Sequence, residues 1–547
     1  MNRPLKIVTA NKLALTNFAT AFVLLLVGGF LGLIQGLNRA GVLEIVGGIN
    51  YYEVLTLHGI FLILAFTTLF MNGYLWSATD YVLGGLTRGI RMMGWVAYGL
   101  FMFGALLVTI MVLAGEATVL YTFYAPMAAN PWFYIGLVFV VLNIWLSGLG
   151  VFISAFRWKR RNKGKHLPLF AFFAVGVYIL ITFATLFVAA EVFYIIPWTF
   201  GWIDTINVML TRTLFWAFGH TLVNVWYLVA VSAWYMVTPK VIGGKLFSDS
   251  LARAVVILIV VLNVPGGFHH QIVDPGFSEG LKFMHLFMSL AIAVPSLLTA
   301  FALFAMLERT GRRRGGKGLL GWFWTLPWHD VRFLTIMLAM ISFIFGGAGG
   351  IAQTNNQLNQ VVHNTLWVVG HFHVTVGVAV VLTFFGLVYW LIPHLSGRVL
   401  TKKIHNLGIW QTMLWTVGML FMTLSMSYVG LIGSPRRTEY TTYGGNATAL
   451  EWDPYLLFVG AGGILLFAGV VLMVYIVYHL MFLSPKGYTP FMVVEEEEED
   501  AHKTPKWTEN WGLWVIVAVL IISMGYLVPL VDLIGNAPPG SPPIRTF

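Results

Sequence analysis

Apolar runs of about twenty or more residues, each long enough to cross a bilayer as a helix, recur along the whole chain. Charged residues gather in the short connections between them. The pattern predicts an all-α integral membrane protein, a bundle of about thirteen transmembrane helices forming one domain over residues 1–547, without internal repeats. The helices are expected near residues 14–36, 54–76, 91–114, 132–155, 168–190, 212–237, 252–270, 283–307, 332–352, 365–393, 408–432, 455–482 and 512–534.

Composition also predicts how the chain is oriented in the membrane. The 547 residues are 58% hydrophobic and 10% charged, with 32 Lys and Arg residues. Cytoplasmic loops retain positive charge during insertion. Placing the N-terminus in the cytoplasm and the C-terminus outside puts all but six Lys and Arg residues on the cytoplasmic side. The net charge of +10 therefore needs no nucleic-acid partner. The six exceptions are Arg39, Arg212, Lys282, Arg436, Arg437 and Arg545.

Three further features narrow the chemistry. The chain has no cysteine, so disulfides, thiolate metal sites and thioether-linked haem are excluded, and any haem must be held through histidine. The acidic run Glu495 to Asp500 is typical of a solvated segment, and we expect an acidic cytoplasmic linker over 494–510 before the last helix. The N-terminus lacks the small-residue cleavage site of a signal peptide, so the first helix is expected to remain.

Six histidines lie within or at the ends of the apolar segments: His58, His220, His269, His270, His371 and His373. Imidazoles are costly in lipid-embedded helices unless they bind something, so the set indicates metal and cofactor ligation. His371 and His373 are two residues apart, about 200° around a helix, and should face opposite sides. That arrangement would let one short stretch contact two haems. Paired with His373, His58 would complete six-coordinate, low-spin iron.

His220, His269 and His270 offer three neutral imidazoles, a set that suits copper better than a hard, oxygen-seeking ion. Each histidine taken singly has a plainer interpretation. One alone fits a satisfied core residue, and the adjacent His269 and His270 fit a pair at the membrane surface. A secondary transporter using buried histidines as proton relays is a further alternative, and it predicts a protein without haem absorbance.

Six stretches carry a resemblance to a known family that spans essentially the whole chain. The chain resembles subunit I of the haem–copper oxidoreductase superfamily, and most resembles its B family, the ba-type oxygen reductases. The stretches are LHGIFLI, GEATVLYTFYAPM, RTLFWAFGHTLV, GFHHQIVDPG, VVHNTLWVVGHFHV and SPRRTEY.

The resemblance implies roles for individual residues. His58 and His373 would ligate a low-spin haem of b or a type, and His371 a high-spin haem of a or b type. One copper ion would face the high-spin iron. The remaining matched positions are the copper ligands His220, His269 and His270, the propionate-binding Arg436 and Arg437, and the propionate-side His363 and Asn364.

One position departs from the family of oxygen reductases. Four residues after the first copper histidine these enzymes carry a tyrosine covalently joined to it, and here that position is Asn224. Splitting dioxygen in one step takes four electrons, of which haem iron and copper supply three and the phenol the fourth. An amide has no accessible oxidation. The following helix, 252–268, has no tyrosine, and Tyr227 lies about 10.5 Å further along the helix than His220, too far to touch the same ligand.

The proton route shows a weaker departure. The family's second route tyrosine on this helix corresponds to Val231, whereas Tyr235, Ser296 and Thr299 match other positions of the route. Ser and Thr in membrane helices often bond only to their own backbone, so their presence carries limited weight. A partly broken route suggests that cytoplasmic proton delivery, and hence pumping, is reduced or rerouted.

Reducing two molecules of nitric oxide to nitrous oxide and water needs only two electrons and two protons, which the haem–copper pair can accommodate without a tyrosine. The sequence therefore favours the catalytic subunit of a respiratory nitric oxide reductase, with Asn224, His371 and His220 at its centre. The alternative is a B-family cytochrome c oxidase that reduces oxygen and translocates protons. The resemblance implies a prokaryotic plasma membrane, a second subunit with an electron-entry site such as a dinuclear copper cupredoxin domain, and a cytochrome c or cupredoxin donor.

Overall fold

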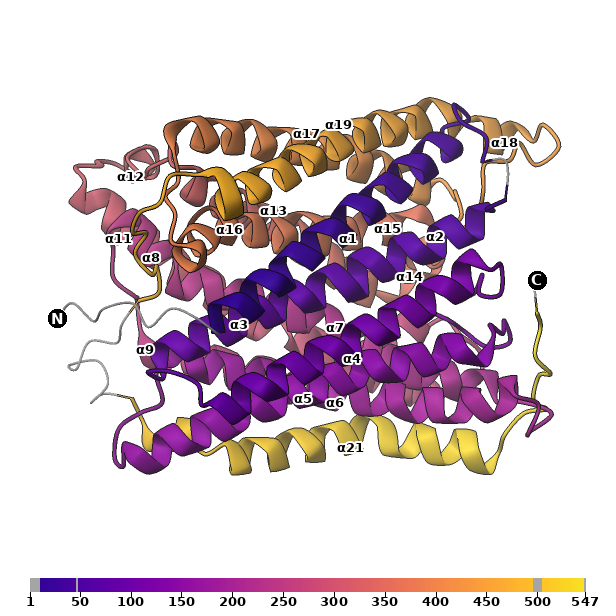
Figure 1. Ribbon diagram of the computed structural model, residues 1–547. Helices are drawn as coiled ribbons and strands as arrows, with labels where there is room; N and C mark the ends of the chain where they lie inside the picture. Colours follow the sequence, from indigo (N-terminus) through magenta and orange to yellow (C-terminus); the bar gives the residue numbers. More distant parts are fainter. Residues whose placement is uncertain (1–9, 46–47, 495–503, 546–547) are drawn as a thin grey trace.

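The computed structural model describes residues 10–45, 48–494 and 504–545, and in these ranges the chain is built of helices with only isolated β-bridges between them (Figure 1). Twelve helices are long and apolar enough to cross a membrane, and a bent helix pair makes a thirteenth span. The predicted all-α membrane bundle is thereby confirmed. The acidic run Glu495 to Asp500 lies outside the described residues.

The first half of the chain forms six spans. The second span is interrupted by a π-helical segment, η1, that starts just after His58. The elements are α1 (Ala10–Arg39), α2 (Tyr51–Gly59), η1 (Ile60–Phe66), α3 (Thr67–Val82), α4 (Arg88–Leu113), α5 (Pro131–Arg161), α6 (Leu169–Thr199) and α7 (Val208–Met236).

The second half forms seven spans, four of them built from two or more consecutive elements. Their elements are α9 (Asp249–Leu262), η2 (Val264–Gln271), α10 (Glu279–Ala291), α11 (Ala293–Arg313), α13 (Val331–Thr354), α15 (Leu366–Phe372), η3 (His373–Val380), α16 (Val381–Ser396), α17 (Lys402–Leu431), α19 (Asp453–Tyr478), η4 (His479–Leu483) and α21 (Trp511–Gly535). Short helices between the spans are α8 (Thr238–Ile242), α12 (Gly321–Trp324), α14 (Asn356–Val362), α18 (Ala447–Leu450) and η5 (Lys506–Glu509).

Two irregular stretches differ from the continuous helices that the apolar pattern predicts. The seventh span bends by 49° between α9 and the 3₁₀ helix η2. Pro265 lies at the start of η2, where its missing N–H and ring disfavour continued α-helix, and Gly266 and Gly267 follow it. The tenth span widens into the π helix η3 from His373 onward. Wide turns of this kind often occur at functional sites.

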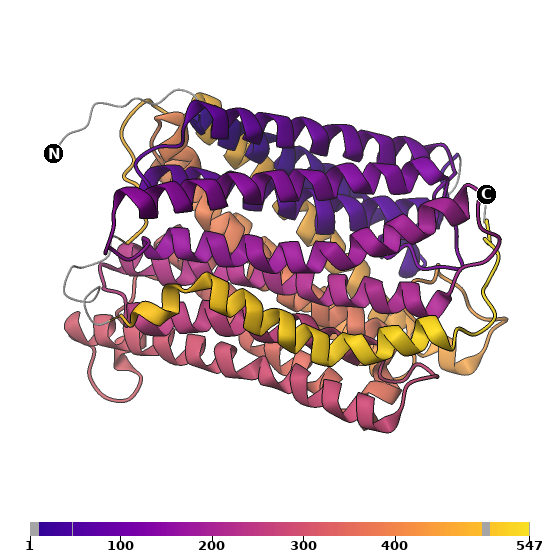
Figure 2. The same ribbon diagram turned by 90° about the horizontal axis from the view of Figure 1, so that it is seen from below.

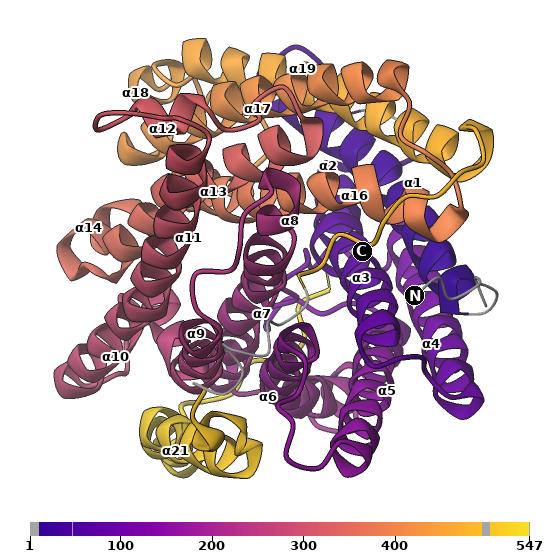
Figure 3. The same ribbon diagram turned by 90° about the vertical axis from the view of Figure 1, so that its left-hand side faces the viewer.

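The spans that carry histidines lie inside the bundle. In the most apolar window of the Leu366–Ser396 span 94% of residues are buried, against 22% for Trp511–Gly535. Seen along the bundle axis, α7 is central and α21 is peripheral (Figure 3). α21 runs along the outside of the bundle (Figure 2). A span surrounded by protein on all sides can hold polar ligands that lipid would exclude.

An ion-pair cluster fixes α21 to the rest of the fold. Arg253, fully buried on α9, pairs with Asp249 at 2.7 Å and with Glu509 at 3.0 Å. Glu509 in η5 also accepts from Lys159 of α5 at 2.6 Å. The described part of the expected linker therefore packs against two helices.

Candidate haem and copper site

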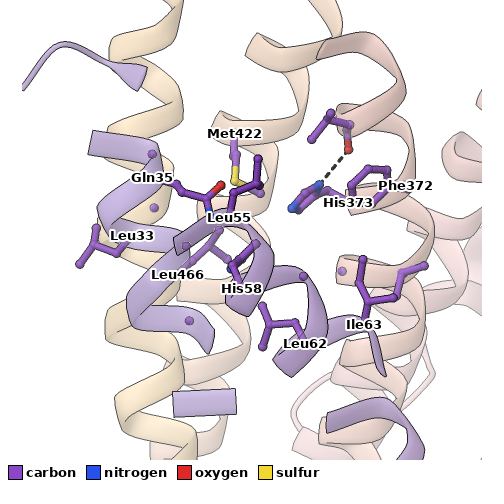
Figure 4. Close-up of a pocket in the computed structure, with 18 of the residues that line it drawn as sticks. Leu33, Gln35, Leu55, His58, Leu62, Ile63, Phe372, His373, Met422 and Leu466 are labelled. Atoms are coloured by element: carbon purple, nitrogen blue, oxygen red, sulfur yellow. Dashed lines mark hydrogen bonds between the residues drawn. The ribbon is translucent and has the colours of Figure 1, made fainter. Parts of the chain in front are cut away.

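Two cavities lie inside the bundle. The first, which we call the His58–His373 cavity, has a volume of about 200 Å³ and is bounded by α1, α2, η1, α15, η3, α17 and α19. Its walls are mostly aliphatic and aromatic, with His58 and His373 among them (Figure 4). The pair predicted for one low-spin haem thus lines one shared cavity.

Hydrogen bonds fix the tautomer of both rings. Nδ1 of His58 lies 2.8 Å from the carbonyl oxygen of Gly28, and Nδ1 of His373 lies 2.8 Å from that of Val369. A carbonyl oxygen only accepts, so each Nδ1 carries the proton and donates it. Each Nε2 then keeps its lone pair. This arrangement orients a neutral imidazole for metal binding.

The second cavity, the His371 cavity, has a volume of about 400 Å³ and lies on the other side of the tenth span. His371 lines it, whereas His373 lines the first cavity, in agreement with the 200° separation. His220, His269 and His270 also line it. The buried Nδ1 of His371 has no hydrogen-bond partner among the described residues.

The three predicted copper ligands come together in space. One ligand atom from each of His220, His269 and His270 can be chosen so that all lie within 4.8 Å of one another. The His220 ring centroid is 4.8 Å from that of His269 and 5.6 Å from that of His270. His270 stacks on Trp216 at 3.8 Å, which fixes its plane.

Ser289 orients His269. Its hydroxyl donates to the carbonyl of Gly266 at 2.7 Å, so it can only accept from Nδ1 of His269 at 3.1 Å. Nε2 of His269 is therefore free to bind a metal.

Asn224 contacts the first histidine of the cluster. Its amide nitrogen lies 3.3 Å from Nε2 of His220 and donates to the His220 carbonyl at 3.0 Å. Because Nε2 faces the amide, Nδ1 is the nitrogen left for a metal. With a metal on Nδ1, Nε2 carries the proton, and the amide oxygen, after a flip, would accept it.

Tyr227 also lines the His371 cavity, but its ring stacks on Phe343 with centroids 4.3 Å apart. The described residues show no hydrogen bond or ring contact between Tyr227 and His220. Asn224, and not Tyr227, is thus the side chain that contacts Nε2 of this imidazole.

Arginines gather at the end of the cavities nearest α18. Arg436 lines both cavities and donates to Oδ1 of Asn364 at 2.7 and 3.2 Å. Arg437 lies over the Tyr124 ring at 5.0 Å, and its Nη2 is buried without a partner among the described residues. An unpaired guanidinium nitrogen beside a cavity favours a ligand with carboxylates there.

Asp274 and His363 complete this region. Asp274 pairs with Arg212 at 3.0 Å, and Nε2 of His363 lies 3.8 Å from the same carboxylate. Burial, together with the charges of Arg436, Arg212 and Arg437, lowers the pKa of His363 to about 4. His363 is therefore neutral near pH 7 and adds no positive charge to the cluster.

Sequence reasoning missed two residues here. Arg39, at the end of α1, lines the His58–His373 cavity and donates to the carbonyls of Thr438 and Pro435. Tyr121 lines both cavities. An arginine that ends a transmembrane helix is a common pattern, so only the fold distinguishes Arg39. Tyr121 falls within a quoted motif but has no distinctive spacing.

These features fit two haems and a copper ion. Two apolar cavities each present imidazole nitrogens with free lone pairs, and Arg437, whose Nη2 is buried without a partner among the described residues, borders the first of them. Three imidazoles converge beside the second cavity. The molecule is an integral membrane protein with a buried site for redox cofactors.

Comparisons with known proteins agree with this class. The family profile described as "Cytochrome C and Quinol oxidase polypeptide I" matches residues 12–465. Subunit 1 of cytochrome c oxidase from Thermus thermophilus is 36% identical over 534 residues, covering 95% of this chain and 94% of the relative. An alternative cytochrome c oxidase subunit 1 from Bradyrhizobium diazoefficiens is 24% identical over 552 residues, covering 92% and 87%.

A solved structure extends the agreement to three dimensions. A chain from the cryo-EM structure of a heme-copper terminal oxidase dimer superposes with a TM-score of 0.91 at 32% identity, covering 98% of this chain and 95% of that one. The chain belongs to the haem–copper oxidase subunit I family. It is an oxidoreductase subunit, so the transporter alternative is set aside.

Proposed function

We propose that this chain is the catalytic subunit of a membrane-bound nitric oxide reductase. In the proposed reaction two molecules of nitric oxide, two electrons and two protons give nitrous oxide and water. One observation carries the proposal: Asn224, 3.3 Å from His220, occupies the position at which the resembled oxygen reductases carry an oxidisable tyrosine.

The printed names of the relatives favour the second candidate, oxygen reduction. Subunit 1 of cytochrome c oxidase is the name of the relative at 36% identity, and the matched solved structure is described as a terminal oxidase. These names give the family's chemistry but describe proteins that differ from this chain at about two thirds of positions. The active-site side chain beside His220 is therefore the better guide to the substrate.

The residues have separate roles in the proposal. His58 and His373 hold the low-spin haem, His371 the high-spin haem, and the three-histidine cluster a copper ion. When bound, these groups supply redox equivalents and two adjacent sites for a diatomic substrate. The protein holds those sites a fixed distance apart, so joining two dilute molecules becomes an intramolecular step. The amide of Asn224 keeps the His220 ring in place and offers hydrogen-bond donors to a bound nitrogen oxide.

The proposed setting is a prokaryotic plasma membrane, with the N-terminus in the cytoplasm and the C-terminus outside. In its support, α1 begins at the left of Figure 1 and α21 ends at the right, so the two helix ends lie on opposite sides of the bundle. The basic segments Arg157 to Lys165 and Arg309 to Lys317 belong to connections on the side where α1 begins. Electrons would arrive through a second subunit from cytochrome c or a cupredoxin, because this chain has no cysteine for a dinuclear copper centre.

Isotope labelling tests the proposal in a single turnover. The purified complex is fully reduced, freed of excess reductant and mixed anaerobically with labelled nitric oxide, and labelled nitrous oxide is counted by mass spectrometry. The proposal expects at least one nitrous oxide molecule per complex. The isosteric variant Asn224→Asp is a useful comparison, because it keeps the shape but changes the charge beside His220. A complex that binds nitric oxide and releases no nitrous oxide would exclude the proposed reaction.

A further inference from the structure

Tyr227 has a buried hydroxyl that packing does not require. Its ring stacks on Phe343 with an interplanar angle of 7°, and a phenylalanine would serve that contact equally well. Its hydroxyl is inaccessible and makes no hydrogen bond of normal geometry among the described residues. Burying a hydroxyl without a partner is unfavourable, so this oxygen calls for an explanation other than packing.

The neighbours of Tyr227 are hydroxyl groups from another span. Its hydroxyl lies beside those of Ser296 and Thr299 on α11. Thr299 lies in turn beside the hydroxyl of Tyr235, which is also buried and unbonded. Thr299 donates to the carbonyl of Pro295 at 2.8 Å, and Ser296 to that of Ile292 at 3.2 Å. Both oxygens therefore present lone pairs to the tyrosines.

These hydroxyls form a line along α7. Tyr235 is the residue before Met236, where α7 ends beside α8, at the left of Figure 1. Tyr227 lies two turns deeper and, with Ser296, lines the His371 cavity. Asn224 follows one turn further on the same face, in contact with His220. A set of hydroxyls thus leads from one end of the bundle to the histidine cluster.

We infer that Tyr227 is a proton-relay residue, carrying protons from Tyr235 and Thr299 to the His371 cavity past the aliphatic Val231. When the Thr299 oxygen accepts a proton from Tyr235, its own proton turns from the Pro295 carbonyl to the Tyr227 oxygen, and Tyr227 releases its proton to the cavity. Each oxygen thus gains one proton and loses one, so every group ends neutral and one proton reaches the cavity. Val231 is fully buried and offers no polar atom. Val231 would interrupt the line of hydroxyls along α7. Tyr227, one turn closer to the His371 cavity, continues that line.

The inference rests on the proposed function only in that the reaction consumes protons, which oxygen reduction also does. The test therefore uses whichever oxidant, nitric oxide or oxygen, the unaltered complex reduces. Tyr227→Phe keeps the ring and removes the hydroxyl. Tyr178→Phe is the matched control, because that buried tyrosine loses a 2.9 Å hydrogen bond to Asn72 away from the line.

The measurement is stopped-flow proton uptake, followed with a pH indicator dye, together with the solvent deuterium isotope effect on turnover. Tyr227→Phe should slow proton uptake and turnover together, by roughly ten- to a hundredfold. Its isotope effect should rise, and its reduced-minus-oxidised haem spectrum should be unchanged. Tyr178→Phe should retain the unaltered rates. Proton uptake at the unaltered rate in Tyr227→Phe would overturn the inference.

If Tyr227→Phe loses its haems, a second pair of variants tests the proton relay. Thr299→Val removes a hydroxyl at nearly constant shape, and Thr299→Ser restores it. Slow proton uptake in Thr299→Val and rescue in Thr299→Ser would support the relay. Equal rates in the two variants would refute it. A failure of the proposed function is recognised separately, because then the unaltered complex makes no nitrous oxide while the Tyr227 result can still be read with oxygen.

Discussion

Replacing Gly32 of α1 by alanine should displace His58 and thereby weaken binding of the low-spin haem. A Cβ at position 32 would lie 2.6 Å from Cε1 and 2.8 Å from Nδ1 of His58. Carbon atoms in contact normally stand about 3.5–4.0 Å apart, so the ring must retreat by roughly 1 Å.

The free-energy cost of displacing the His58 ring has two parts, a lost hydrogen bond and an unfavourable rotamer. Moving it breaks the 2.8 Å hydrogen bond from Nδ1 to the Gly28 carbonyl, worth about 0.5–1.5 kcal/mol. The forced departure from a relaxed rotamer adds about 0.5–1.5 kcal/mol. Together these terms amount to about 1–3 kcal/mol, or about 5- to 150-fold weaker retention of the haem.

The assay is the haem-to-protein ratio of the purified complex and the optical spectrum of its reduced low-spin haem, measured before and after mild detergent challenge. Gly99→Ala on α4 is the control, because a Cβ there meets nothing within 4 Å and alanine favours helix. Gly32→Ala should lose low-spin absorbance selectively while Gly99→Ala keeps it. Unchanged low-spin content and spectrum in Gly32→Ala would refute the role given to His58.

Three other substitutions, the last with a comparison variant, test separate parts of the account. His220→Ala should lose copper, measured by elemental analysis, and keep both haems; normal copper content would undo the ligand assignment. Asn224→Tyr should bring no gain in nitric oxide turnover, and a large gain would count heavily against the proposed reaction. Glu509→Gln removes a carboxylate from the fully buried Arg253 and should lower stability by about 1–3 kcal/mol in thermal unfolding, with haem content unchanged. Lys159→Met, whose native side chain is 39% exposed, should cost less, and equal effects would show that the Arg253 pair is not the main contact.

The membrane spans could be predicted because a lipid environment admits few solutions. A backbone crossing lipid must satisfy its own hydrogen bonds, so apolar runs of sufficient length become helices. The same helical regularity predicts that His371 and His373 face opposite sides, and they line different cavities. The bend at Pro265 was not predicted, because the apolar run indicated one continuous helix over 252–270, whereas Pro265 and the two glycines after it end the α-helix there.

The sequence pattern could not predict contacts between spans that are far apart along the chain. Arg39 bonds to the carbonyl of Thr438, 399 residues away, and no local signal links the two. Tyr227 was judged by its rise along α7 alone, which separates it from His220 but says nothing of the hydroxyls on α11. Periodicity fixes which face of a helix a residue occupies, whereas the packing of helices decides what that face meets.

The most direct test of the central claim is turnover of the pre-reduced complex with nitric oxide and, separately, with oxygen, following nitrous oxide formation and oxygen loss on one preparation. Fast nitrous oxide formation with feeble oxygen consumption is the predicted result, because Asn224 cannot supply the electron that a tyrosine gives. Rapid four-electron reduction of oxygen to water, with little nitrous oxide, would contradict the account.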